Sequence, residues 1–362
     1  MSKPTIHVIE PTLQDEAGHC HSFVRSICEA GEPYAPRRVV WTGRRVEPDI
    51  LQTSGAEVIP FFYRRIRRPQ SFFLYRRLLR EPGRIFVATA SRTDVILLQL
   101  AADERIPKNK VFLYFHWLTH TRERRDFFRK MAGKQPDLVI LGPTQSVVQF
   151  FLDCGFLNAN LVPYPITPKN RDERPGPFHF RHLLFAGAAR QDKGFHHIVK
   201  FLAYLAERQN YIPALIQTSS EHYNKYDSGT KELLRRLKEI YYPSLELCPD
   251  TMETPQFLNL FPGAICLQPY HKEDFSDRIS GITLDALSEG CPIIATSGTW
   301  MARVAGRFDA GAVIDDAAPE HMLFAVQSIM SDYSRYSENA LKAGLILEQE
   351  HNAANLLSII AS

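Results

Sequence analysis

Two aspartates eight positions apart, Asp277 and Asp285, stand in the stretch DRISGITLDALSEGCPIIAT and carry the chemistry to bind a polyhydroxylated ligand. A Ser280-Gly281 turn separates them, and the next residues have the apolar spacing of a short helix that Gly290 ends. A helix beginning at Ser280 directs N–H groups and its positive dipole end outward, which suits a phosphate. We expect Asp285 to accept hydrogen bonds from a ribose and Asp277 to hold a sugar hydroxyl. The same residues also fit an ordinary turn, helix and strand with two solvated aspartates.

A second candidate group is the pair of cations Arg190 and Lys193. They lie in the loop GAARQDKG, between an apolar strand at 183–186 and a helix whose apolar positions recur from Phe195 to Leu205. Two cations beside a helix N-terminus can neutralise a diphosphate leaving group. The alternative is a solvated pair of loop residues.

The first half of the chain offers His116, at the end of the predicted strand VFLYFHW (111–117). Ligands of open α/β sheets gather at the carboxyl ends of the strands, where a histidine can form a hydrogen bond with a sugar hydroxyl. The alternative is a histidine with a structural role. Gly18 lies in the loop between the predicted first strand (5–11) and the first helix. We interpret His19 and His21 as ordinary residues of that loop and helix start.

The stretch around Asp277 resembles the donor-binding signature of retaining GT-B glycosyltransferases of family four (glycosyl transferases group 1). In that pattern a Glu, seven residues and a second Glu precede Ala, Gly-Xaa-Pro and an apolar strand. The two aspartates occupy the Glu positions, and Ala286, Gly290 and Pro292 follow in step. Aspartate in place of glutamate shortens the reach of each carboxylate by about one methylene. The family's Gly-Phe-Gly is only partly kept, as residues 278–281.

The resemblance implies roles for residues of this chain. Family members carry an Arg and a Lys-Gly for the leaving diphosphate, a histidine contacting the donor sugar, and a glycine turn after the first strand. The catalytic candidates are therefore His116, Arg190, Lys193 and Asp277. The candidates for binding the donor are Gly18, Ser280, Gly281, Ile282, Thr283 and Asp285. Cations take the place of a metal in this family, so we expect neither a metal nor a cofactor beside the donor substrate.

The elements that position these residues alternate between strand and helix along the whole chain, which predicts an α/β fold. The resemblance implies GT-B architecture, with two Rossmann-like domains facing each other across a cleft. We place an acceptor-binding domain at 1–168 and a nucleotide-sugar-binding domain at 169–345, joined by the Pro- and charge-rich linker 167–177. A C-terminal helix at 346–362 is expected to pack back towards the first domain.

Composition narrows the setting. The chain has 362 residues, a net charge of +3 and six scattered cysteines without a CxxC pair, so neither a zinc site nor a disulfide framework is indicated. It has neither a signal-peptide pattern nor a membrane span, and we expect a cytoplasmic protein. Basic, aromatic-rich segments at 63–84 and 121–130 fit either solvated helices or a peripheral contact with the anionic inner face of a membrane. We expect no nucleic-acid partner.

We therefore expect a glycosyltransferase, retaining and metal-independent, that moves a sugar from a nucleoside-diphosphate sugar to a glycan or lipid-linked glycan. Surface polysaccharide or lipopolysaccharide synthesis is the expected setting. Two alternatives stay open because a fold does not fix a function. One is a sugar-nucleotide epimerase on the same scaffold, and the other is a non-catalytic glycan- or lipid-binding subunit with a decayed donor site.

Overall fold

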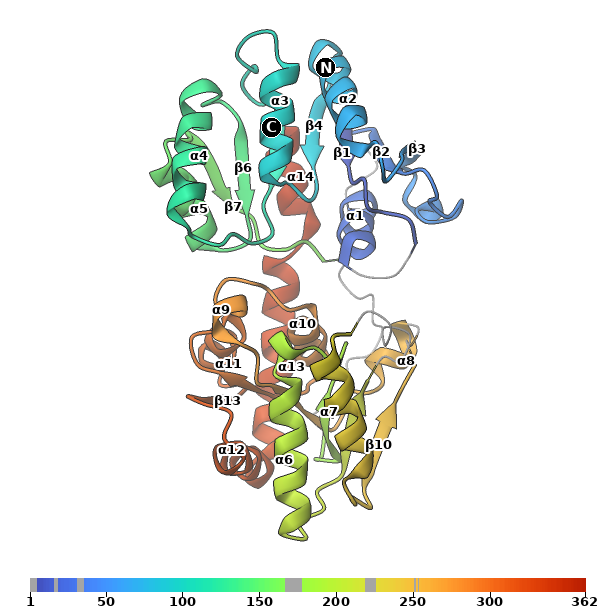
Figure 1. Ribbon diagram of the computed structural model, residues 1–362, viewed down its shortest axis with the longest axis vertical. Helices are drawn as coiled ribbons and strands as arrows, with labels where there is room; N and C mark the ends of the chain where they lie inside the picture. The colour runs from blue at the N-terminus through green and yellow to red at the C-terminus, as the bar shows by residue number, and fades with distance from the viewer. Residues whose placement is uncertain are drawn as a thin grey trace. The chain divides into compact units, whose positions relative to one another are not determined.

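The computed structural model describes residues 5–15, 19–30, 36–166, 178–218, 226–250, 252 and 254–362. The chain divides into two compact units (Figure 1). Unit 1 comprises residues 1–169 and 348–362, and unit 2 comprises residues 170–347. Gly18 and the predicted linker 167–177 lie outside the described residues.

Unit 1 is built on a parallel sheet with strand order β3-β2-β1-β4-β5-β6-β7. The strands are β1 (Ile6–Ile9), β2 (Arg38–Gly43), β3 (Glu57–Phe62), β4 (Arg84–Val87), β5 (Val111–Tyr114), β6 (Val139–Gly142) and β7 (Asn158–Leu161). The helices are α1 (His19–Glu29), α2 (Arg67–Arg80), α3 (Arg92–Ala101), α4 (Arg122–Lys134), α5 (Gln145–Asp153) and α14 (Ala353–Ala361), with a 3-10 turn η1 (Gln52–Ser54).

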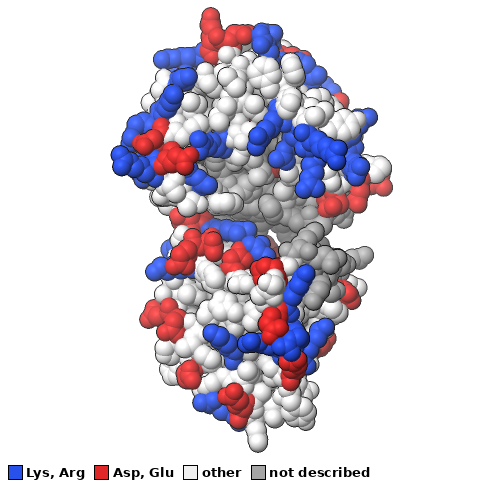
Figure 2. All heavy atoms as spheres, viewed as in Figure 1, with Lys and Arg blue, Asp and Glu red and all other residues white. Residues whose placement is uncertain are grey.

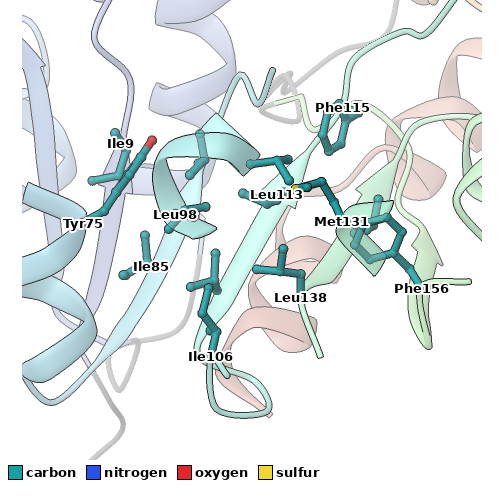
Figure 3. Packing of buried hydrophobic residues seen from close by; sticks show 14 of the residues in the cluster. Ile9, Tyr75, Ile85, Leu98, Ile106, Leu113, Phe115, Met131, Leu138 and Phe156 are labelled. Carbon is teal, nitrogen blue, oxygen red and sulfur yellow. The ribbon is translucent and has the colours of Figure 1, made fainter. Parts of the chain in front are cut away.

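Alternating side chains of these strands feed two cores on opposite faces of the sheet. On one face, Ile9, Ile85 and Leu113 pack with Leu98 of α3 and Met131 of α4 (Figure 3). On the other face, the neighbouring residues of the same strands pack with apolar residues of α1 and α14. Both faces of the sheet are therefore buried, as parallel sheets require.

The last strand of unit 1 precedes the more apolar stretch LVPYPI (161–166) and shares only its first residue, because β7 ends at Leu161. Two prolines, Pro163 and Pro165, follow in that stretch and have no N–H to donate to a neighbouring strand. The less apolar segment Asn158–Leu161 pairs with β6 instead.

Unit 2 repeats the plan with the strand order β10-β9-β8-β11-β12-β13, again parallel. The strands are β8 (His182–Phe185), β9 (Ala214–Gln217), β10 (Leu245–Cys248), β11 (Ala264–Gln268), β12 (Ile293–Thr296) and β13 (Gly311–Ile314). The helices are α6 (Phe195–Glu207), α7 (Ser228–Glu239), α8 (Thr254–Leu258), α9 (Lys272–Phe275), α10 (Gly281–Ser288), α11 (Trp300–Phe308), α12 (Pro319–Ser331) and α13 (Tyr333–Glu350), with a 3-10 turn η2 (Gln191–Lys193).

Strand order marks one switch point in each unit. The chain winds outward in one direction from β1 and from β8, then returns to the other side with β4 and β11. In open α/β sheets, the loops that follow the strands at such a point diverge, and ligands bind there at the carboxyl edge. In unit 2 this switch point lies between β8 and β11, and in unit 1 between β1 and β4.

The last helix belongs to unit 1. Leu356, Leu357 and Ile360 of α14 pack in the core that α1 covers, and the Arg84 guanidinium donates a hydrogen bond to the carbonyl of Ile360. Just before α14, the N–H of Ile166 donates to the carbonyl of His351 over 2.9 Å. Among the described residues, none of the helices is both long enough and apolar enough to cross a lipid bilayer.

Candidate functional site

The loop after β8 holds Lys193 in a confined place at the switch point of unit 2. Gly187 has φ +92°, and a Cβ added there would lie 2.7 Å from Lys193 Nζ and 3.6 Å from the Ile282 side chain. The ammonium therefore lies over the end of β8, next to the first turn of α10. It also lies 5.8 Å from the ring centroid of buried Tyr270. Loss of hydration and, after it, the neighbouring Arg190 lower the pKa of Lys193 to about 8, and Asp192 opposes the shift.

Three cations share this loop region with one carboxylate. Arg190 makes a two-point hydrogen bond to Asp192, with Nε donating to Oδ1 over 2.8 Å and Nη2 donating to Oδ2. Arg278 Nη1 lies 3.7 Å from the same Asp192 Oδ2. Burial, Arg190 and then Asp192 set the pKa of Arg278, which is lowered overall. With Lys193 added, three cations gather around Asp192, and this concentration of positive charge suits a diphosphate.

Helix α10 begins where the sequence predicted. Ser280 is its N-cap residue and buried, and Gly281 is exposed with open space where a Cβ would be. Among the described residues no carbonyl accepts from the N–H groups of Gly281 and Ile282, whereas the N–H of Thr283 donates to the Ser280 carbonyl over 3.1 Å. Two N–H groups and the positive end of the helix dipole are thus presented to a ligand.

The Thr283 side chain points the other way. It is fully buried, and its hydroxyl donates to Gln268 Oε1 over 2.8 Å. Its side chain therefore supports the core under α10.

The two aspartates of the signature lie on opposite sides of the Ser280 turn. Asp285 is partly exposed and three residues after Ile282, which places it on the same side of α10. Both Lys193 and Asp285 influence the pKa of buried Cys266, which desolvation raises to about 12. Asp277 Oδ1 lies 3.7 Å from Arg303 Nη2. Asp285 thus shares the neighbourhood of Lys193, while Asp277 pairs with a cation of α11.

Unit 1 places His116 two residues beyond β5. Its ring packs on Phe23 and Tyr114, with centroids 4.8 and 4.9 Å away, and Nε2 lies 2.9 Å from the carbonyl oxygen of Ala88. Because a carbonyl only accepts, this contact places a proton on Nε2. The neighbouring Thr89 hydroxyl donates to Glu10 Oε2 over 2.5 Å.

Glu10 is a polar residue near His116 that the sequence pattern did not single out. It follows β1 directly, is 1% exposed and also accepts from the N–H of Thr12 over 3.1 Å. An acidic residue that ends an apolar strand was the available signal, and its link to His116 through Thr89 depends on the pairing of β1 with β4. Asp192 and Arg278 of unit 2 were missed for the same reason.

The predicted site residues are divided between the two units. The residues that lie close to the switch point of unit 2 are Arg190, Lys193, Ser280, Gly281, Ile282 and Asp285. His116 belongs to unit 1.

No protein-family model matches the chain, and no curated protein does either. Solved structures match it over nearly its full length at low identity. HepE (Alr3699) of Anabaena, solved with UDP-glucose, aligns with TM-score 0.69 and 12% identity over 99% of this chain and 98% of that one. The sucrose-phosphate synthase of Thermosynechococcus elongatus aligns with TM-score 0.69 and 13% identity, covering 98% and 96% of the two chains.

The chain has the GT-B fold. A further match is WaaG, a glycosyltransferase of lipopolysaccharide biosynthesis, with TM-score 0.63, 12% identity and 99% and 100% of the two chains covered. The predicted fold class is thereby confirmed. At these identities the comparison establishes the fold, and the activity has to be argued from the residues of the site.

Proposed function

We propose that the protein is a glycosyltransferase that takes its sugar from a nucleoside-diphosphate sugar bound at the switch point of unit 2. The observation that carries the proposal is the convergence of Arg190, Lys193 and Arg278 with the free N–H groups that begin α10. A site where three cations gather fits a diphosphate, and we assign Asp285 to the ribose. The structure of HepE with UDP-glucose supports the same class of donor.

Bond cleavage leaves negative charge on the β-phosphate, and stabilising that charge is the main chemical task. Lys193 and Arg190 supply cations for it, and the N–H groups of Gly281 and Ile282 supply fixed dipoles. We assign Asp277 and His116 to the transferred sugar and its acceptor, as the family resemblance implies. A retaining reaction without a metal ion follows from the same resemblance.

The acceptor we propose is a glycan or a lipid-linked glycan, in the synthesis of a surface polysaccharide or lipopolysaccharide. This proposal rests on the likeness to WaaG and on the surface of unit 1. Figure 2 shows Lys and Arg side chains over α2 and α4. The two helices differ, however, in whether their arginines form ion pairs with acidic residues.

The arginines of α4 are largely paired with acidic residues. Arg122 and Arg129 lie 4.0 and 3.4 Å from Asp126, and Arg125 lies 3.7 Å from Asp153. Before and at the start of α2, by contrast, the exposed Arg64, Arg65 and Arg68 form no ion pair with any described residue.

Large apolar side chains stand beside the unpaired arginines. Phe73 is 66% exposed, and Tyr63 and Ile66 are each 51% exposed. Exposed apolar side chains beside unpaired cations suit the interface of an anionic membrane. We therefore propose a peripheral contact through the segment 63–73, with the protein at the cytoplasmic face.

The membrane contact is tested with vesicles of phosphatidylcholine alone or mixed equally with phosphatidylglycerol. Each arginine near an anionic surface contributes about 1 kcal/mol, so replacing Arg64, Arg65 and Arg68 by Gln should weaken binding at least a hundredfold. The matched control replaces Arg122, Arg125 and Arg129, whose charges are paired. Equal losses for both triple variants would contradict the assignment to α2.

The donor is identified with a panel of nucleotide sugars, by calorimetric titration and by product analysis with wild type, Lys193→Ala and Asp285→Ala. We expect one donor to bind wild type and to bind both variants at least tenfold more weakly. Transfer to an added glycan acceptor supports the proposal, and free epimerised nucleotide sugar would point to an epimerase. If millimolar nucleotide sugar fails to bind wild type, a binding subunit becomes the better interpretation.

A further inference from the structure

Three histidines of unit 2 come together beside the switch point, although the sequence separates one of them widely. His196 and His197 are the second and third residues of α6, and His271 precedes α9. One ring nitrogen of each lies within 4.8 Å of those of the other two. The ring centroids of His196 and His197 are 3.9 Å apart, and that of His271 is 5.4 Å from His196. None of these three histidines belongs to the candidate donor site.

One atom of this cluster lacks the partner that buried polar atoms normally have. His196 Nδ1 is buried and has no hydrogen bond among the described residues. A buried nitrogen without a partner destabilises the folded protein, so native structures rarely leave one. Coordination to a cation would satisfy it.

We infer that His196, His197 and His271 form a binding site for one divalent transition-metal ion, of the class of Zn²⁺, Co²⁺ or Ni²⁺. Imidazole nitrogen is a preferred ligand of these ions, and three protein ligands with one open position make a familiar tetrahedral set. Tetrahedral bonds of about 2.0–2.1 Å place ligand nitrogens about 3.4 Å apart. The cluster reaches that spacing when its ring nitrogens approach one another by at most about 1.4 Å.

An acidic residue beside the cluster fits an outer shell. His271 Nδ1 lies 3.8 Å from Asp274 Oδ2, an arrangement that leaves Nε2 to the metal. A carboxylate that holds the second nitrogen of a ligating histidine fixes its tautomer and orientation.

The histidine cluster also contacts the loop that carries Arg190 and Lys193. The N–H of His271 donates to the carbonyl of Asp192 over 3.0 Å, and Asp192 is the residue that holds Arg190. A Cβ on Gly194 would lie 1.9 Å from the carbonyl oxygen of Pro269, so the two loops already touch. A metal joining α6 to His271 would fasten these loops together. The ion would thus connect α6 to the loop before α9, with its fourth position left to water, and the inference stands independently of the proposed function.

The test uses tag-free, full-length protein stripped with a chelator and titrated with ZnCl₂ in a calorimeter and with CoCl₂ in a spectrophotometer. We expect one ion per chain and the intense visible absorption of tetrahedral Co²⁺. His196→Ala and His271→Asn should each weaken binding at least tenfold. His271→Asn changes a side chain that is 36% exposed, so this variant keeps the test valid if His196→Ala does not fold.

Two control variants exclude other ligands. His120→Ala removes an exposed histidine of unit 1, and Cys20→Ser removes the one cysteine that is not buried. Neither should alter the stoichiometry or the Co²⁺ spectrum. Binding without saturation, a Co²⁺ spectrum typical of octahedral water ligands, or equal affinity in His271→Asn and wild type would each overturn the assignment.

Discussion

Lys193 should destabilise the protein in the absence of a donor, because its ammonium is held where hydration is poor. The lowering of its pKa from 10.5 to about 8 means that the charged form is less stable in the folded protein than in the unfolded chain. A shift of this size corresponds to about 3 kcal/mol. The partial exposure of the side chain makes that an upper limit. Lys193→Met keeps the aliphatic stem and removes the charge, so at pH 7 it should stabilise unit 2 by up to about 3 kcal/mol.

The destabilisation of the folded protein by charged Lys193 should depend on pH. Below about pH 8 the folded and unfolded states both hold the Lys193 proton, and the full penalty is present. Between about pH 8 and 10.5 the folded state has lost the proton while the unfolded chain still binds it, so the penalty shrinks. The advantage of Lys193→Met should therefore be largest at pH 7 and fade towards pH 10.5. Donor affinity of the wild type should fall over the same range, since the neutral amine no longer attracts the diphosphate.

Hydrogen exchange of the β8, β11 and β12 amides, measured against urea concentration, reports the unfolding free energy of unit 2 by itself. The matched control is Lys238→Met, which removes an exposed lysine of α7 in the same unit. Lys193→Met should gain stability and lose donor binding, whereas Lys238→Met should change neither. A Lys193→Met protein that is less stable than wild type at pH 7 would refute the argument that the charge is held against a desolvation cost.

Three other substitutions test the surroundings of Lys193. Gly187→Ala places a methyl group 2.7 Å from Lys193 Nζ at φ +92°, and should reduce donor affinity at least tenfold in calorimetry and stability by about 1–3 kcal/mol; wild-type affinity would contradict the placement of the ammonium. Asp192→Asn removes the one carboxylate that holds Arg190, and should cost about 1 kcal/mol of stability at low salt. Added pyrophosphate should restore that loss in urea titrations, and an equal loss with and without it would speak against charge repulsion. Thr283→Val removes the hydroxyl that donates to Gln268 Oε1, and should lower stability by about 1–3 kcal/mol in the same titrations. The affinity for the sugar donor should be unchanged, and weaker binding by a folded variant would indicate that the Thr283 side chain contacts the donor.

The elements of unit 2 were predictable because local signals agree with one another. Ser280 begins α10, Gly290 follows its end with φ +69°, and the apolar run after Pro292 forms β12. These features depend on neighbours within about ten residues of sequence. The same holds for α6, whose predicted apolar face is buried throughout.

Contacts between distant segments were not predictable in this way. Asp192 contacts both Arg190 and Arg278 only because β8 and β11 are adjacent in the sheet. Local sequence patterns do not predict strand order. His196 and His197 meet His271 for the same reason. The sequence predicts no metal site, because its cysteine spacing indicates none and no local pattern pairs histidines that are 74 or more positions apart. Glu10 reached Thr89 through the pairing of β1 with β4.

The return of the C-terminal segment to unit 1 bears on the order in which the protein is made. Residues 348–362 complete unit 1, yet all of unit 2 is translated before them. Until α14 emerges from the ribosome, the face of the first sheet that receives Leu356, Leu357 and Ile360 is covered by α1 without α14. Unit 2, encoded without interruption, can fold as soon as it is synthesised. The nascent chain therefore finishes its second half before its first, and interrupted translation leaves an exposed apolar surface for chaperones or proteases to recognise.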